Sequence, residues 1–94
     1  MKKKTPLKKQ QIIRIMGRFN FEKVQRHMAA TNWKWHDVGI PTVEQLKQHA
    51  ERLLKSYHSG LMNSGSGGFT VRTDSHQNPM LSFEVAHSDT YDEE

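Results

Sequence analysis

A chain of 94 residues has room for one domain with a small core, because a polypeptide of this length buries roughly 60–70% of its unfolded surface. It has no cysteine, which excludes disulfides and thiolate metal sites, and no stretch approaches the roughly 18 apolar residues that a membrane-spanning helix needs. Only 34% of the residues are hydrophobic and the mean hydropathy is −0.84, so we expect part of the chain to be tail or loop.

The net charge of +4 conceals two halves of opposite sign. Residues 1–35 carry ten Lys or Arg and one acid, whereas residues 36–94 carry four basic residues and nine acids. We therefore predict a disordered basic tail over residues 1–5, a single domain over residues 6–87 and an acidic tail over residues 88–94. Arg14 and Arg18 interrupt the first apolar residues, so we expect no signal peptide.

Two short helices are predicted in the first 30 residues. Thr5-Pro6 is typical of an N-cap followed by the first helical position, and the apolar stripe that follows predicts a helix from about Pro6 to Met16, ending near Gly17. Asn20 is the candidate N-cap of a second helix from Phe21 to about Ala30.

The middle of the chain predicts a strand and a longer helix. Residues 33–36, Trp-Lys-Trp-His, alternate large apolar with polar side chains, which favours a short strand with both indoles on one face. Residues 41–60 predict the main helix, because Thr42 and Gln45 have capping-box spacing, an apolar stripe follows, and Gly60 supplies a stop.

The last third predicts a loop and a β-hairpin. Residues 59–68 are rich in Gly and Ser, which indicates a flexible loop. Period-2 runs at Phe69–Thr73 and Leu81–Ala86 favour two strands, in which Arg72 and Glu84 would pair across the exposed face. We therefore predict an α+β fold of order α-α-β-α-β-β, a small antiparallel sheet packed on one face by helices.

Motifs for catalysis are missing from the sequence. The six histidines show no metal-ligand spacing, although incidental zinc or nickel binding stays open, and neither a GxSxG nor a phosphate-loop motif occurs. Gly65-Ser66-Gly67-Gly68 precedes a predicted strand, whereas a phosphate loop follows one. We predict no enzyme, cofactor, catalytic residue or metal site; a metal- or small-ligand-dependent hydrolase is the weakest of three hypotheses.

Binding is the remaining class of function. Basic residues of the front half predict salt-dependent, non-specific nucleic-acid contacts: Lys2, Lys3, Lys4, Lys8, Lys9, Arg14, Arg18, Arg26 and Lys34. Trp33 and Trp35 would add stacking surfaces if exposed, but two such residues also suit a core. The apolar side chains of the first helix predict a protein interface: Leu7, Ile12, Ile13 and Ile15. Complementary charge halves also allow a homodimer, and monomer against dimer stays open.

Four stretches carry a resemblance to a known group: FNFEKVQRHMAATNWKW, GIPTVEQLKQHAERLL, GGFTV and LSFEV. Across residues 19–86 the chain resembles small uncharacterised proteins of bacteriophages and prophages, with Asn20 where Asp is expected. The resemblance implies an accessory role in a bacterial cytoplasm and brings no catalytic or binding residues with it. The sequence thus predicts a non-enzymatic phage-type accessory protein, not associated with membranes, that binds a host or phage protein, with nucleic-acid binding as the alternative.

Overall fold

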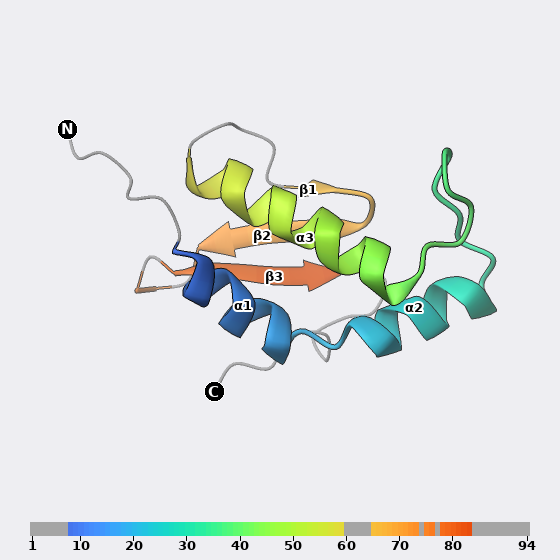
Figure 1. Ribbon diagram of the computed structural model, residues 1–94, viewed down its shortest axis with the longest axis horizontal. Coiled ribbons are helices and arrows are strands. Elements are labelled where there is room, and N and C mark those ends of the chain that lie inside the picture. Colours follow the sequence, from blue (N-terminus) through green and yellow to red (C-terminus); the bar gives the residue numbers. More distant parts are fainter. Residues whose placement is uncertain (1–7, 60–64, 74, 77, 84–94) are drawn as a thin grey trace.

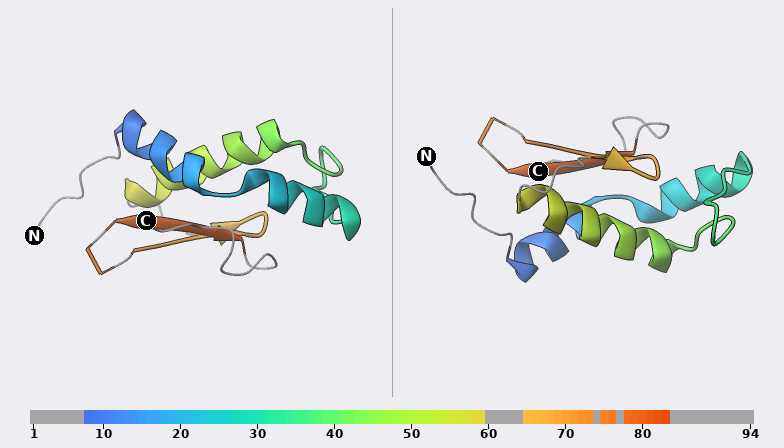
Figure 2. Two further views of the ribbon diagram at one scale, coloured as in Figure 1. Left: turned by 90° about the horizontal axis from the view of Figure 1, so that it is seen from below. Right: turned by 90° about the horizontal axis from the view of Figure 1, so that it is seen from above.

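The computed structural model describes residues 8–59, 65–73, 75–76 and 78–83. Within these residues three helices precede three antiparallel strands: α1 Lys9–Arg18, α2 Phe21–Ala30, α3 Val43–His58, β1 Gly65–Ser66, β2 Phe69–Thr73 and β3 Pro79–Phe83. The sheet has the order β1-β2-β3, and all three helices lie on one of its faces (Figures 1 and 2). The predicted α+β class is confirmed. None of the described helices has the length and apolar character that crossing a membrane requires.

Helix α3 is the central element, since it packs against α1, α2, β2 and β3. Its start is the predicted capping box: the backbone N–H of Gln45 donates to Thr42 Oγ1 at 3.2 Å, and the backbone N–H of Thr42 donates to Gln45 Oε1 at 2.9 Å. These bonds satisfy amides that the first helical turn leaves without partners. The helix ends at His58, and the predicted stop at residue 60 lies outside the described residues.

The two short helices follow the predicted stripes with shifted ends. Asn20 caps α2 as predicted, because its Oδ1 accepts from the backbone N–H of Lys23 at 2.9 Å. Helix α1 begins at Lys9, not at Pro6, and runs through the predicted stop at Gly17. Glycine lowers helix stability without preventing it, and no atom crowds this position, so the helix continues to Arg18.

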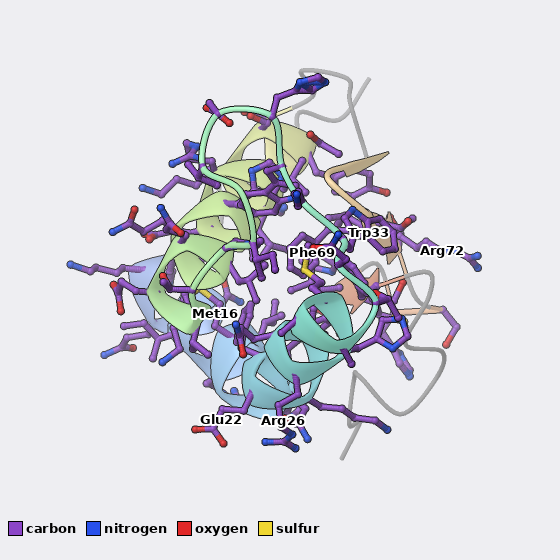
Figure 3. The ribbon with its side chains drawn as sticks, turned by 90° about the vertical axis from the view of Figure 1, so that its right-hand side faces the viewer. Met16, Glu22, Arg26, Trp33, Phe69 and Arg72 are labelled. Atoms are coloured by element: carbon purple, nitrogen blue, oxygen red, sulfur yellow. The ribbon has the colours of Figure 1, made fainter. Side chains whose placement is uncertain are left out.

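The core lies between the helices and the inner face of the sheet. In the register of β2 and β3, Phe69 pairs with Phe83 and Val71 with Leu81, and all four side chains are buried. The rings of Phe69 and Phe83 meet edge to face, with centroids 5.2 Å apart. In Figure 3 Phe69 points into the molecule and Arg72 points away from it. The predicted alternation of the hairpin is therefore confirmed over these residues.

The predicted tryptophan strand is wrong. Residues 33–40 form a turn, closed by mutual backbone hydrogen bonds between Trp35 and Gly39 of 2.6 and 2.8 Å. Gly39 has a φ of +75°, a conformation that favours glycine and reverses the chain. Trp33, Lys34 and Trp35 therefore lie in the first arm of this turn and do not add a strand to the sheet.

The third strand comes instead from the segment predicted to be a flexible loop. β1 pairs with β2 across a two-residue turn at Gly67 and Gly68, whose φ values are +63° and +96°. Two positive φ values are what a type I′ hairpin turn requires. The element order is thus α-α-α-β-β-β, with the third strand at residues 65–66; residues 60–64 of the predicted loop lie outside the described ones.

The described residues test only some of the remaining predictions on the last strand and the two tails. Strand β3 begins at Pro79, two residues before the predicted start, and Arg72 pairs with Met80 in the register. Because Arg72 lies opposite Met80, the predicted cross-strand pairing of Arg72 with Glu84 is wrong. The basic tail of residues 1–5 and the acidic tail of residues 88–94 lie outside the described part of the chain.

Candidate nucleic-acid interface

The predicted protein interface on α1 is largely used by the core. Ile12 is 1% exposed and Ile15 is 9% exposed, so neither side chain can contact a partner. Their spacing of three places both on the helix face that packs against the rest of the domain. Ile13 points outward at 55% exposure, and Leu7 lies outside the described residues. The assignment of Ile12 and Ile15 to an interface is therefore corrected.

The surface of the described residues is strongly basic. These residues include eleven Lys or Arg and four Asp or Glu. Five predicted nucleic-acid contacts are exposed: Lys8, Lys9, Arg14, Arg26 and Lys34. Arg18 is half-buried, and Lys2, Lys3 and Lys4 lie outside the described residues. The only structural support for an interface in this set is exposure and charge.

Arg26 shows how these cations are presented. It projects from α2 away from the sheet, next to Glu22 (Figure 3). Arg72, in contrast, projects from β2 beyond the edge of the core on the side of the sheet, well separated from Arg26 in the same view. The helical layer and the sheet therefore present cations to different sides of the molecule.

The two tryptophans occupy different places, so they do not form the shared face that a strand would give. Trp33 is half-buried and packs on Phe83, with ring centroids 5.1 Å apart. Trp35 is half-buried too, but its ring contacts His49 of α3 at 4.9 Å, and its Nε1–H donates to the carbonyl of Gly67 at 3.4 Å. The turn at residues 33–40 thus directs one indole to the core and the other to α3.

A groove of about 560 Å³ lies beside Trp35, where the 34–38 turn, α3 and the turn after β1 meet. This volume falls within the range of roughly 300–1,000 Å³ that ligand sites usually have. The side chains that give the groove its chemical character are Lys34, Trp35, His36, Asp37, His49 and Arg52. Among the described lining residues, the groove therefore combines two positive charges and one negative charge with an aromatic ring.

The inner wall of the groove is held by contacts between distant segments. His49 Nε2 lies 3.1 Å from the carbonyl oxygen of Ser66, and the indole of Trp35 reaches the next carbonyl, of Gly67. Both contacts connect side chains to the backbone of the β1–β2 turn, which orients the two rings before a ligand arrives. Gln45 and Gln48 of α3 add amide groups to the lining, which can donate or accept hydrogen bonds.

A second hollow, of about 360 Å³, lies where α1 gives way to α2. Its lining includes Arg18, Glu22 and Lys47 together with backbone around Gly17. Its aromatic members, Phe19 and Phe21, are buried in the core and offer no ring surface to a ligand. This hollow lacks the combination of an accessible ring and surrounding cations that the first groove has.

Several groove residues are not among the candidate site residues that the sequence predicts. His49 and Arg52 fall on the polar side of α3, where a charged or imidazole side chain is usually just solvated. They become part of a groove because the Trp35 turn and the β1–β2 turn fold over that side of the helix. The Gly67-Gly68 pair in front of an alternating strand was the available signal, since it is typical of a tight hairpin.

The fold and the groove define a small two-layer α+β domain with a basic, aromatic-lined groove. No protein-family model matches the chain, and no curated protein or solved structure shows significant similarity to it. Among the described residues, no three His, Asp or Glu side chains gather closely enough to hold a metal ion.

Proposed function

We propose that this chain binds nucleic acid without sequence specificity through the cations of its helical layer and of the Trp35 groove. The observation that supports this most is the excess of eleven basic over four acidic side chains among the described residues. Lysine and arginine that neutralise phosphates release condensed counterions, which drives binding and makes it salt-dependent. The phosphate backbone is the same for every sequence, so this attraction carries no sequence preference.

Binding to a protein partner has less support from the surface. The cores of protein interfaces are enriched in aromatic and apolar side chains. Within the described residues, the large apolar side chains that are exposed are Ile13 and Val38, at 55% and 40%. Five other features stay predictions: a host or phage protein partner, a homodimer, the absence of enzymatic activity, a phage accessory role and a cytoplasmic location.

A salt titration tests the proposal. Fluorescence anisotropy with a labelled single-stranded 20-mer is measured from 50 to 200 mM salt, and we expect affinity to fall steadily as salt rises. Each phosphate contact to a single strand contributes about 0.7 to the slope of log K against log salt. The double variant Arg14→Gln/Arg26→Gln should therefore lower that slope by about 1.4.

Arg72→Gln is the matched control, because it removes an exposed arginine that projects from the sheet away from Arg26. We expect it to leave the slope unchanged. No binding at micromolar protein and 50 mM salt would refute the proposal. An equal loss of slope per arginine in the control and in the double variant would refute the assignment to the helical layer.

A further inference from the structure

We infer that the groove beside Trp35 is a binding subsite for an unpaired nucleobase, which makes the chain prefer single-stranded to duplex nucleic acid. This inference rests on the proposed function and adds to it the form of the ligand and the residues that recognise it. It follows from three properties of the groove: its aromatic wall, its charges and the way its wall is fixed.

The aromatic wall is the indole of Trp35. This side chain is half-buried and lines the groove, so part of its ring surface stays accessible. Bases stack on aromatic side chains without regard to their identity, because every base has a π face. Trp33 does not serve this purpose, since it is absent from the groove lining and packs on Phe83. The subsite therefore contains one tryptophan of the Trp-Lys-Trp segment.

Contacts with neighbouring segments orient the wall before binding. The indole of Trp35 is fixed at one edge by its hydrogen bond to the Gly67 carbonyl and packs on the ring of His49, which itself contacts the Ser66 carbonyl. A ring that is already oriented loses little conformational entropy when a base stacks on it. This arrangement therefore favours a ring-shaped ligand more than a mobile surface side chain would.

The charges around the ring match a nucleotide strand. Lys34 on the turn and Arg52 on α3 are both exposed and both line the groove, and His36 lies on the same turn. A strand whose base lies on Trp35 would present its neighbouring phosphates to these cations. Asp37 is the one acidic side chain among the described residues of the lining, and its carboxylate accepts hydrogen bonds from amino groups such as those on base edges. Charge complementarity thus favours a strand over an uncharged aromatic ligand.

The geometry also separates single strands from duplexes. In a duplex each base is covered on both faces by its neighbours, so no base can stack on Trp35 without leaving the helix, which costs a few kcal/mol. An unpaired base avoids most of that cost. Cations outside the groove attract both forms, but the groove adds affinity for the single strand alone.

The first experiment uses Trp35 as its own reporter. In a Trp33→Phe background, the remaining indole emission is titrated with a 12-nucleotide single strand of thymidine, with a 12-base-pair duplex and with thymidine monophosphate. We expect the single strand to quench the emission at lower concentration than the monophosphate, and the duplex to bind without quenching. Equal affinities for strand and monophosphate would overturn the role given to the neighbouring phosphates.

The second experiment removes the ring. Trp35→Leu should weaken binding of the single strand by roughly 5- to 150-fold, the range expected for one stacked base, and leave duplex binding unchanged. A single-strand to duplex ratio equal to that of the wild type would overturn the inference, while salt-dependent binding of both forms would still support the proposed function. Loss of all binding in the wild type would refute the proposed function itself.

Charge variants keep the inference testable if Trp35→Leu fails to fold. Arg52→Gln changes an exposed side chain of the groove, and Lys55→Gln changes an exposed cation three positions along α3 that is outside the groove and pairs with Glu51. We expect Arg52→Gln to lower the single-strand salt slope by about 0.7 and Lys55→Gln to lower it by less, because Lys55 lies outside the groove and pairs with Glu51. Equal slopes for the two variants would contradict the placement of the strand in the groove.

Discussion

Replacing Gly68 with alanine tests the turn on which both the sheet and the groove depend. Gly68 has a φ of +96°, and a Cβ there would lie 2.8 Å from Cζ of Phe83 and still closer to its Cε1. Phe83 is fully buried and packs edge to face on Phe69, so its ring cannot move aside freely. The substitution therefore combines a backbone conformation that disfavours side chains with a steric overlap in the core.

Each part of this effect has a known size. A non-glycine residue in a left-handed conformation costs about 1–2 kcal/mol, and overpacking a core costs about 1–3 kcal/mol. Together they predict that Gly68→Ala lowers the free energy of unfolding by about 2–5 kcal/mol, a large share of the roughly 5–15 kcal/mol that small domains have. For a domain of this size the melting temperature should fall by about 8 °C or more.

Gly17→Ala supplies the matched control for thermal or urea unfolding. Gly17 lies in α1 without a positive φ. Apart from its chain neighbours and the backbone of its own helix, nothing lies within 4 Å of a Cβ at this position. Alanine is a better helix former than glycine, so this variant should gain about 0.5–1 kcal/mol. A Gly68→Ala protein as stable as the wild type, or a Gly17→Ala protein as unstable as Gly68→Ala, would refute the assignment of the turn.

Three other changes separate buried from exposed features in the same unfolding assay. Asn20→Ala removes the cap of α2 and should cost about 0.5–2 kcal/mol, whereas an unchanged midpoint would show that the cap is unimportant. Ile12→Ala should cost about 2–5 kcal/mol and Ile13→Ala less than about 0.5 kcal/mol, because the first is buried and the second exposed; similar losses would contradict the orientation of α1. Glu51→Gln breaks the exposed pair with Lys55, 3.6 Å apart, and should change stability by less than about 0.5 kcal/mol, so a loss above 1 kcal/mol would reveal a stronger role.

The parts of the fold that the sequence predicts well depend on short-range rules. The capping box at Thr42 and Gln45 and the cap at Asn20 are decided within four residues, and both were identified correctly. The alternation of Phe69 and Val71 is likewise a local consequence of burying one strand face. Such features leave their full signal in the adjacent sequence.

The incorrect predictions arose where one local pattern fits two structures. Alternating large and polar side chains at Trp33 and Trp35 suit a strand, but they also suit the segment leading into a turn, in which the two indoles contact different neighbours. Gly39 favours the turn, because its positive φ lets its backbone form hydrogen bonds with the backbone of Trp35. Strand β1 lies in a segment whose Gly- and Ser-rich composition indicates a loop. The two adjacent glycines directly before Phe69 are the feature that indicates a hairpin turn instead.

The groove was beyond local patterns because its residues come from segments 17 to 32 positions apart. His49 reaches Ser66, and Trp35 reaches Gly67, through contacts that only the folded chain brings together. The sequence did place Lys34 among candidate nucleic-acid contacts, and it offered Trp33 and Trp35 as stacking surfaces if they were exposed. It gave no sign that Arg52, on the polar side of a well-predicted helix, would face them.

The β1–β2 turn links stability to the shape of the groove, and this distinguishes the present proposals from simple charge attraction. A Cβ at Gly67 would lie 3.1 Å from His49 Nε2 and 3.2 Å from Trp35 Nε1, so a side chain at that position would push the two rings back by a few tenths of an ångström. A protein that attracted phosphates by charge alone would need no such fit, because the exposed Lys34 and Arg52 could attract phosphates without an oriented indole beside them. The close packing of Trp35 and His49 on a glycine turn is therefore expected either of a structural contact or of an oriented stacking surface. Trp35 lines an open groove together with Lys34 and Arg52, and that position favours the stacking surface.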